Sequence, residues 1–342
     1  DFILINHDGV KAVKDLPPSP NIAILVIDES TAYKNPSAQR SKAMLKLAEH
    51  FPRRILMSGT PNPHGVMDLW HQYRILDDGN LLGPSYYRFR NIVCEPTPGP
   101  FPRWIDKPGS AEAVADLISP ITIRHEFQKV LDIPPNHNYS LYIDLPKNLR
   151  NDYRRFEKEL ILELEGNKIT AKNAAAKLGK LLQIASGRAY NADKEVVNLD
   201  SSRTELVADL IEARQQCVVA YNWKHQALAL TQELNSRGIK AGLINGETPQ
   251  RARAHYVNEF QQEKLQVIIA HPATAAHGIT LTKGTTTIWT SPTPNVEHYK
   301  QFNHRIFRAG QTRKTETINI LANDTVDTHV FDNMMGKVNA LE

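Results

Sequence analysis

Two arginines near the carboxyl end of the chain have a spacing suited to binding an anion. Arg305 and Arg308 lie three residues apart in the segment QFNHRIFRAGQ, residues 301–311, which begins with Gln301. On a helix such residues share a face, so two guanidiniums there need an anionic partner. A triphosphate fits, because an arginine aimed at its γ-oxygens stabilises the charge of phosphoryl transfer. An ordinary basic helix face is the alternative explanation.

A pair of carboxylates lies far upstream. The run AILVID, residues 23–28, is typical of a strand buried on both faces of a parallel sheet, with chemistry at its carboxyl end. Asp28 and Glu29 then stand side by side. In nucleotide motors such an Asp holds Mg²⁺ and the Glu positions the attacking water. A strand end followed by a solvated acidic turn is the alternative here.

Four segments in order resemble the motifs of one family. DESTAYKN (28–35), MSGTP (57–61), AHGITL (276–281) and residues 301–311 resemble motifs II, III, V and VI of Swi/Snf-type translocases of helicase superfamily two, especially compact bacterial and phage-encoded members. The resemblance implies an α/β fold with two RecA-like parallel-sheet lobes, ATP and Mg²⁺ as cofactors, and double-stranded DNA as a sequence-independent partner. It also implies DNA-dependent ATP hydrolysis.

The resemblance also implies roles for individual residues. Asp28 would hold the metal and Glu29 would position water. Arg308 would be the main arginine finger, with Gln301 and Arg305 organising the γ-phosphate side. Gly278, in a small-residue turn whose backbone could approach a phosphate, would join the two arginines in binding ATP.

Several polar residues follow expected strand ends and are candidates for contacts with DNA phosphates. Such contacts place a duplex without reading its sequence. A structural role in a turn is the competing explanation for each residue. Two histidines, 271 and 277, lack helical metal-ligand spacing and have no cysteine pair beside them, so no zinc site is expected. The candidates for nucleic-acid binding are Ser58, Thr60, Asn222, Trp223, Asn245, His271 and Thr274.

The phosphate-loop pattern G-x-x-x-x-G-K-[ST] occurs nowhere in the 342 residues. The backbone amides of that loop cradle the phosphates, and its lysine reaches the β- and γ-phosphates. The resemblance places the loop upstream of the segment where this chain begins. We therefore expect an amino-terminally incomplete first lobe and a chain that is inactive alone. A non-catalytic nucleic-acid-binding or regulatory module derived from such a motor is the alternative function.

The length of 342 residues predicts two domains. We expect the carboxyl-terminal part of lobe one, with a Pro-rich insertion, over residues 1–140. A helical linker follows over 141–190, and lobe two over 191–342, where alternating strand and helix patterns predict a parallel sheet. A short strand is expected at residues 2–6, no regular structure in the Pro-rich segment around residues 96–104, and helices over Lys147–Glu165 and residues 168–185.

The composition excludes several classes of protein. Hydrophobic residues make up 41% and charged residues 23%, as in soluble globular proteins. The net charge of +4 and a pI near 8.9 are compatible with nucleic-acid binding. Two cysteines form no disulfide framework, which favours a reducing compartment, and no apolar run is long enough to span a membrane. We expect a cytoplasmic protein, associated with the nucleoid or acting in a phage-infected cell.

Overall fold

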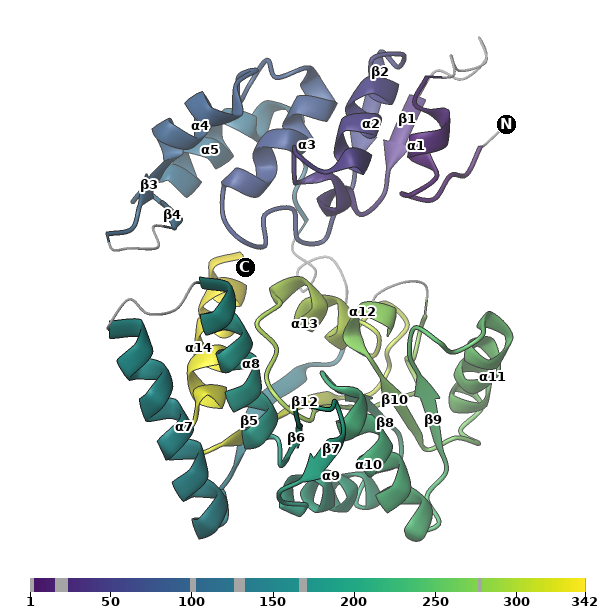
Figure 1. The fold of residues 1–342 in the computed structure, drawn as a ribbon. Coiled ribbons are helices and arrows are strands. Elements are labelled where there is room, and N and C mark those ends of the chain that lie inside the picture. Colours follow the sequence, from purple (N-terminus) through teal and green to yellow (C-terminus); the bar gives the residue numbers. More distant parts are fainter. Residues whose placement is uncertain are drawn as a thin grey trace. The chain divides into compact units, whose positions relative to one another are not determined.

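The computed structural model describes residues 3–15, 24–98, 103–125, 133–165, 171–275 and 279–341. The chain divides into two compact units, residues 1–125 and 126–340 (Figure 1).

The first unit contains a parallel pair of strands and an antiparallel pair. β1 runs beside β2 with Ile24 opposite Arg53 and Ile27 opposite Leu56. Residues 3–6, expected to form a strand, are not in one. The Pro-rich segment, expected to be irregular, begins and ends in the short strands β3 and β4, which pair with each other. The elements of this unit are α1 (Val10–Val13), β1 (Ile24–Ile27), η1 (Ser30–Tyr33), α2 (Gln39–Ala48), β2 (Arg53–Leu56), α3 (Met67–Asp77), α4 (Tyr86–Val93), β3 (Cys94–Pro96), β4 (Trp104–Asp106), α5 (Ser110–Ile118) and η2 (Ser119–Ile121).

Strand β1 is covered on one face only. Ile27 is buried with Tyr33, Met44 and other residues of α2 and α3. Ile24 and Val26 are 44% and 53% exposed, so the expectation of a strand buried on both faces is wrong for the described residues. The reason is packing: side chains alternate along a strand, and the described helices cover only the side that carries Ile27.

The second unit is built on a six-stranded parallel sheet in the order β5-β12-β11-β8-β10-β9. This confirms the predicted α/β fold with parallel sheets. All residues of β8, β10 and β11 are buried, as is typical of central strands, and α9 and α10 lie together on one side of the sheet (Figure 1). The elements are β5 (Asn136–Ile143), α7 (Lys147–Glu165), α8 (Ala171–Ala185), β6 (Arg188–Tyr190), β7 (Val196–Asn198), α9 (Ser202–Glu212), β8 (Cys217–Ala220), α10 (Lys224–Ser236), β9 (Ala241–Ile244), α11 (Gln250–Gln261), β10 (Val267–Ala270), α12 (Pro272–Ala275), β11 (Thr286–Trp289), α13 (Val296–Asn303), β12 (Thr315–Ala322) and α14 (Val326–Leu341).

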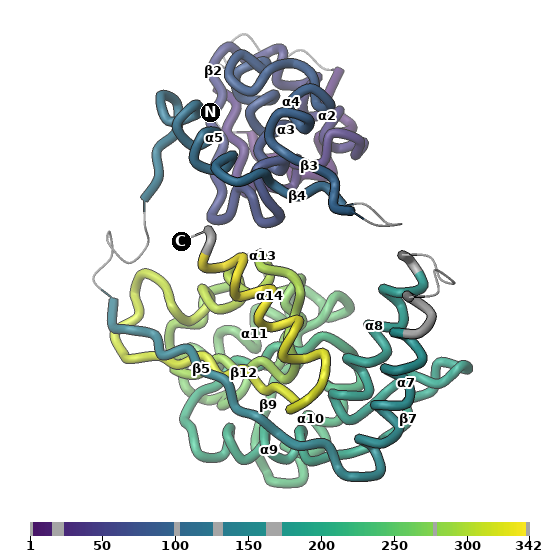
Figure 2. Tube along the Cα trace, turned by 90° about the vertical axis from the view of Figure 1, so that its left-hand side faces the viewer, coloured from purple at the N-terminus to yellow at the C-terminus, as the bar shows by residue number. Residues whose placement is uncertain are grey.

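Strand β5 joins this sheet at its edge. It pairs with β12 from Asn136 opposite Thr315 to Ile143 opposite Ala322, and the two strands run side by side in Figure 2. The first residues of β5, which the sequence analysis assigned to the first domain, therefore pair within the second unit. Helices α7 and α8, predicted as a linker, pack together in this unit as well, and the Val326 N–H donates to Tyr153 Oη at 2.8 Å.

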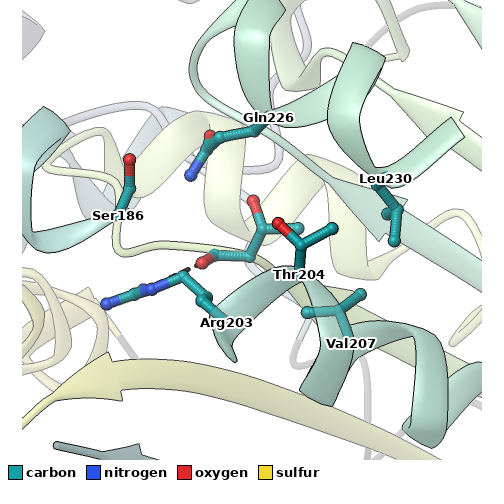
Figure 3. Close-up of a pocket in the computed structure, with 7 residues that line it drawn as sticks. Ser186, Arg203, Thr204, Val207, Gln226 and Leu230 are labelled. Carbon is teal, nitrogen blue, oxygen red and sulfur yellow. Dashed lines mark hydrogen bonds between the residues drawn. The ribbon is translucent and has the colours of Figure 1, made fainter. Parts of the chain in front are cut away.

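A buried ion pair and the hydrogen bonds of its arginine connect five segments of the second unit. Arg203 on α9 is 3% exposed and donates to Asp327 Oδ2 at 2.6 Å. It also donates to the carbonyls of Ala185, Thr290 and Ile320 at 2.9, 2.9 and 3.0 Å. Beside Arg203 lies a cavity of about 10 Å³ (Figure 3). This cavity has room for about one water molecule, so it is a small gap in the packing and not a ligand site.

We predict that Arg203→Met strongly destabilises the second unit. The change removes the cation and leaves the fully buried carboxylate of Asp327 uncompensated, which costs about 3–5 kcal/mol of unfolding free energy. Urea unfolding of the 342-residue chain, followed by circular dichroism, measures this loss. Arg155→Met is the control, because the Arg155–Asp152 pair is largely exposed and contributes little. Equal losses in the two variants would contradict the prediction.

Candidate active site

The first part of the candidate site is the acidic turn after β1. Asp28 is exposed, and its Oδ1 accepts the N–H of Glu29 at 3.0 Å. Glu29 has φ 48° and ψ 54°, a left-handed conformation that costs a residue with a Cβ about 1–2 kcal/mol. Strained backbone of this kind is concentrated at functional sites. The turn therefore presents two adjacent carboxylates at the end of a parallel strand.

The turn of residues 58–61 lies beside the acidic turn. The Met57 N–H donates to the carbonyl of Ile27 at 2.8 Å, and the Ser30 N–H donates to the carbonyl of Met57 at 2.9 Å. Ser58 is half-buried and its Oγ accepts the N–H of Thr60 at 3.2 Å. Thr60 is only 5% exposed, so a DNA contact through its side chain requires the turn to move.

The two arginines lie in turns after α13. This helix ends at Asn303, so the premise that Arg305 and Arg308 share a helix face is wrong. Beyond the helix, the carbonyl of Arg305 accepts the N–H of Leu281 at 2.9 Å, and Ile306, between the two arginines, is buried. Spacing by three residues cannot distinguish a helix from successive turns.

Hydrogen bonds bring the arginines to the segment that begins at Ile279. Arg305 donates to the carbonyls of Gln301 and Ile279 at 3.0 and 3.2 Å. Arg308 Nη1 donates to Thr280 Oγ1 at 3.0 Å. The segments identified as motifs V and VI therefore meet within the second unit. Gly278 itself lies outside the described residues.

Gln311 fixes this arrangement, although the sequence analysis assigned it no role. It is 3% exposed, and its Nε2 donates to the carbonyls of Thr282 and Gly284, both at 3.0 Å. Its Oε1 accepts the N–H groups of Thr312 and Arg313. This buried glutamine could not be identified from a single sequence, since the carbonyls of Thr282 and Gly284 to which it donates lie 29 and 27 residues away.

Three of the predicted DNA-contact segments end along one edge of the large sheet. Ala220, Ala270 and Ile244 are the last residues of β8, β10 and β9 and lie in register. The residues that follow them, among them Asn222 and Asn245, therefore lie along the same edge, with the end of β10 between those of β8 and β9. This is the edge of a parallel sheet at which ligands bind in open α/β folds.

Much of the polar capacity of these residues is used inside the fold. Asn222 Nδ2 donates to Ser291 Oγ at 2.8 Å and to the carbonyl of Pro292 at 3.0 Å. The N–H groups of Asn222 and Trp223 both donate to Gln226 Oε1. Asn245 Oδ1 accepts the N–H of Glu247 at 2.9 Å. These hydrogen bonds give the residues a structural role, and their role in DNA binding stays a prediction.

His271 directly precedes α12, and Thr274 lies within it. The Thr274 N–H donates to the carbonyl of His271 at 2.9 Å, and the His271 ring packs against Tyr221 with centroids 5.5 Å apart. Burial lowers the pKa of His271, which favours the neutral ring. A neutral imidazole can donate one hydrogen bond to a phosphate oxygen. Among the described residues, no group of three or more His, Cys, Asp or Glu is placed to hold a metal ion.

Comparison with known families decides the identity of these motifs. Residues 2–194 match the SNF2-related domain, and residues 202–310 match the helicase conserved C-terminal domain. The chain belongs to the SNF2-related family. The resemblance found from the sequence motifs is thereby confirmed.

Relatives of this SNF2-related chain occur in phages and animals. Protein p41 of Acyrthosiphon pisum secondary endosymbiont phage 1 is 30% identical over 352 residues, covering 97% of this chain and 74% of the phage protein. The DNA annealing helicase and endonuclease ZRANB3 of Bos taurus is 26% identical, covering 90% of this chain and 28% of that protein. The Sulfolobus solfataricus SWI2/SNF2 ATPase core in complex with dsDNA is 20% identical with a TM-score of 0.46, covering 98% of this chain and 70% of that one.

Two further observations bear on the environment of the SNF2-related chain. Both cysteines, Cys94 and Cys217, are free and buried. No helix in the described part of the chain is long and apolar enough to cross a membrane.

Proposed function

We propose that this chain provides most of the catalytic machinery of an ATP-dependent double-stranded-DNA translocase. The observation that carries the proposal is the presence, in one SNF2-related chain, of an acidic turn after a parallel strand and of two arginines hydrogen-bonded to the segment after Gly278. Members of helicase superfamily two use such parts to hydrolyse ATP in response to DNA.

In the first unit, Asp28 binds the metal ion and Glu29 acts on the attacking water. Mg²⁺ keeps several waters and binds one or two carboxylates together with substrate phosphates. The exposed carboxylate of Asp28, which accepts one backbone hydrogen bond, fits this requirement. When bound, the ion neutralises charge that develops on the phosphates. Glu29 orients the attacking water and accepts its proton.

In the second unit, the arginines face the γ-phosphate. Arg305 is held by two backbone carbonyls, so it positions the segment as well as supplying charge. Arg308 makes an exposed hydrogen bond to the hydroxyl of Thr280, which a phosphate oxygen can replace. Arg308 is therefore the finger, and Gln301 and Arg305 organise the surroundings.

DNA lies against the strand-end residues of the second unit and the turn of residues 58–61 of the first. The proposed contacts are amides, hydroxyls and ring N–H groups, which meet phosphates rather than base edges, so binding should be independent of sequence. Because the chain also carries a net charge of +4, binding should weaken as salt rises.

The 342-residue chain alone should bind ATP poorly and show no DNA-stimulated hydrolysis. Positioning accounts for most of phosphoryl-transfer catalysis, and the sequence contains no phosphate loop to grip the β-phosphate. The test is isothermal titration with ATP–Mg²⁺ and a phosphate-release assay with and without duplex DNA. The product of the complete native reading frame is assayed in parallel, and it should hydrolyse ATP when DNA is added.

Two outcomes would change this proposal. Micromolar ATP affinity and DNA-stimulated turnover of the 342-residue chain would show that another segment replaces the phosphate loop. DNA binding without any ATP hydrolysis by the complete product would favour a non-catalytic nucleic-acid-binding module instead.

A further inference from the structure

A glutamine outside the motifs connects the two turns of the first unit. Gln72 lies on α3 and is 2% exposed. Its Oε1 accepts a hydrogen bond from Ser30 Oγ at 2.7 Å. Its Nε2 donates to the carbonyl of Pro61 at 2.6 Å and to the carbonyl of Asp68 at 2.7 Å. One carboxamide thus binds the residue after Glu29 and the last residue of the 58–61 turn.

The contact with Ser30 matters because of the backbone next to it. Glu29 is in a left-handed conformation, which persists only where the surroundings hold it. Ser30 is 3% exposed and is held twice, by its N–H on the carbonyl of Met57 and by its hydroxyl on Gln72. The Ser30 N–H belongs to the peptide bond that joins Glu29 to Ser30, so holding Ser30 also restrains the backbone of Glu29.

Helix α3 also holds the other end of the short helix after Glu29. His71 Nδ1 donates to the carbonyl of Tyr33, the last residue of η1, at 2.7 Å. Burial lowers the pKa of His71, so this contact is made by a neutral ring. Neighbouring residues of α3 therefore hold η1 at both ends, and Gln72 also binds the 58–61 turn.

We propose that Gln72 is a positioning residue that holds the Glu29 turn and the 58–61 turn in one joint arrangement, so that movement of either is transmitted to the other. The inference rests on the proposed function, in which the first turn serves ATP and the second serves DNA. Gln72 touches neither ligand. It acts through Ser30 and Pro61.

Gln72→Met separates this role from simple packing. Methionine has a similar length and flexibility, so the core stays filled, but all three hydrogen bonds are lost. Tyr73→Phe is the matched control, since it removes one hydrogen bond of the adjacent residue, to Thr122 Oγ1 at 2.5 Å, away from both turns. Ser30→Ala is the second variant, because it removes only the contact with the acidic turn.

The first measurement is amide hydrogen exchange in the 342-residue chain. Loss of about one buried hydrogen bond should speed exchange roughly tenfold. In Gln72→Met, exchange should be faster by this factor at the amides of both Ser30 and Thr60, which lie in the two turns. Ser30→Ala removes its own hydroxyl and should affect the acidic turn alone. Tyr73→Phe should affect neither. Unchanged exchange at both turns in Gln72→Met would overturn the proposal.

The second measurement is steady-state ATP hydrolysis by the product of the complete reading frame. Gln72→Met should lower kcat about 10- to 100-fold, with KM for ATP little changed and with a smaller stimulation by DNA, as expected when a catalytic group is misplaced. Tyr73→Phe should keep wild-type values. If the wild-type protein hydrolyses no ATP, the proposed function fails. The hydrogen-exchange measurement alone then tests whether Gln72 holds the two turns together. If the wild type is active and Gln72→Met matches it, Gln72 only packs the core.

Discussion

ATP turnover should fall by about two to four orders of magnitude when Glu29 is replaced by Gln in the product of the complete reading frame. The replacement keeps the size of the side chain and removes the carboxylate that we propose accepts the proton of the attacking water. Asp28 keeps its carboxylate and its hydrogen bond to the backbone at residue 29, so the metal ligand is preserved. ATP should therefore still bind while the chemical step is lost.

The measurement combines phosphate release at saturating ATP and DNA with a separate titration of ATP binding. Glu49→Gln is the control, because Glu49 is exposed at the end of α2 and undergoes the same chemical change away from the strand ends. That variant should keep wild-type turnover. Near-normal turnover of Glu29→Gln would remove Glu29 from the mechanism. A parallel loss of ATP binding would indicate that the residue mainly shapes the turn.

The second unit was predictable because its strands carry local signals. Runs such as Cys217–Ala220 and Val267–Ala270 are wholly apolar, and each is followed by a helix, which is the pattern of a parallel sheet. Helix Lys147–Glu165 was predicted to its boundaries for a similar reason, since its apolar residues recur at helical spacing.

The predictions were wrong where packing between segments distant in the sequence determines burial or the end of a helix. The run at residues 23–28 has the composition of a fully buried strand, yet Ile24 and Val26 are half-exposed because burial depends on which elements cover the sheet. Arg305 and Arg308 have helical spacing, yet the helix ends at Asn303, and the carbonyl of Arg305 binds the distant Leu281 N–H. Neither fact is contained in the local sequence.

Buried polar residues were the hardest features to foresee. Gln72 meets Ser30 from 42 residues away, and Arg203 meets Asp327 from 124 residues away. A polar residue in an amphipathic helix usually lies on the solvent side, so a single sequence gives no reason to place these inside. The residues that carry the motifs were identifiable from type and order, whereas the residues that hold them in place were not.

Arg308→Ala should lower kcat by about three orders of magnitude or more, which is the effect of removing an arginine finger. Among the described residues, its guanidinium makes one hydrogen bond, the exposed one to Thr280 Oγ1, so its loss should leave the fold of the second unit intact. An interaction made only in the transition state changes kcat and leaves ligand binding nearly unaffected. DNA affinity and KM for ATP should accordingly change little.

Arg313→Ala is the matched control for charge. Arg313 contacts the same stretch of chain, through the carbonyl of Lys283, and its removal costs the protein the same positive charge. If Arg308 acts as a finger, only Arg308→Ala loses turnover, and Arg308→Lys recovers little because an ammonium cannot reproduce the planar fork of a guanidinium. If DNA affinity collapses in Arg308→Ala while ATP hydrolysis at saturating DNA survives, Arg308 binds the phosphate backbone of DNA, and the charge that stabilises the γ-phosphate must come from Arg305.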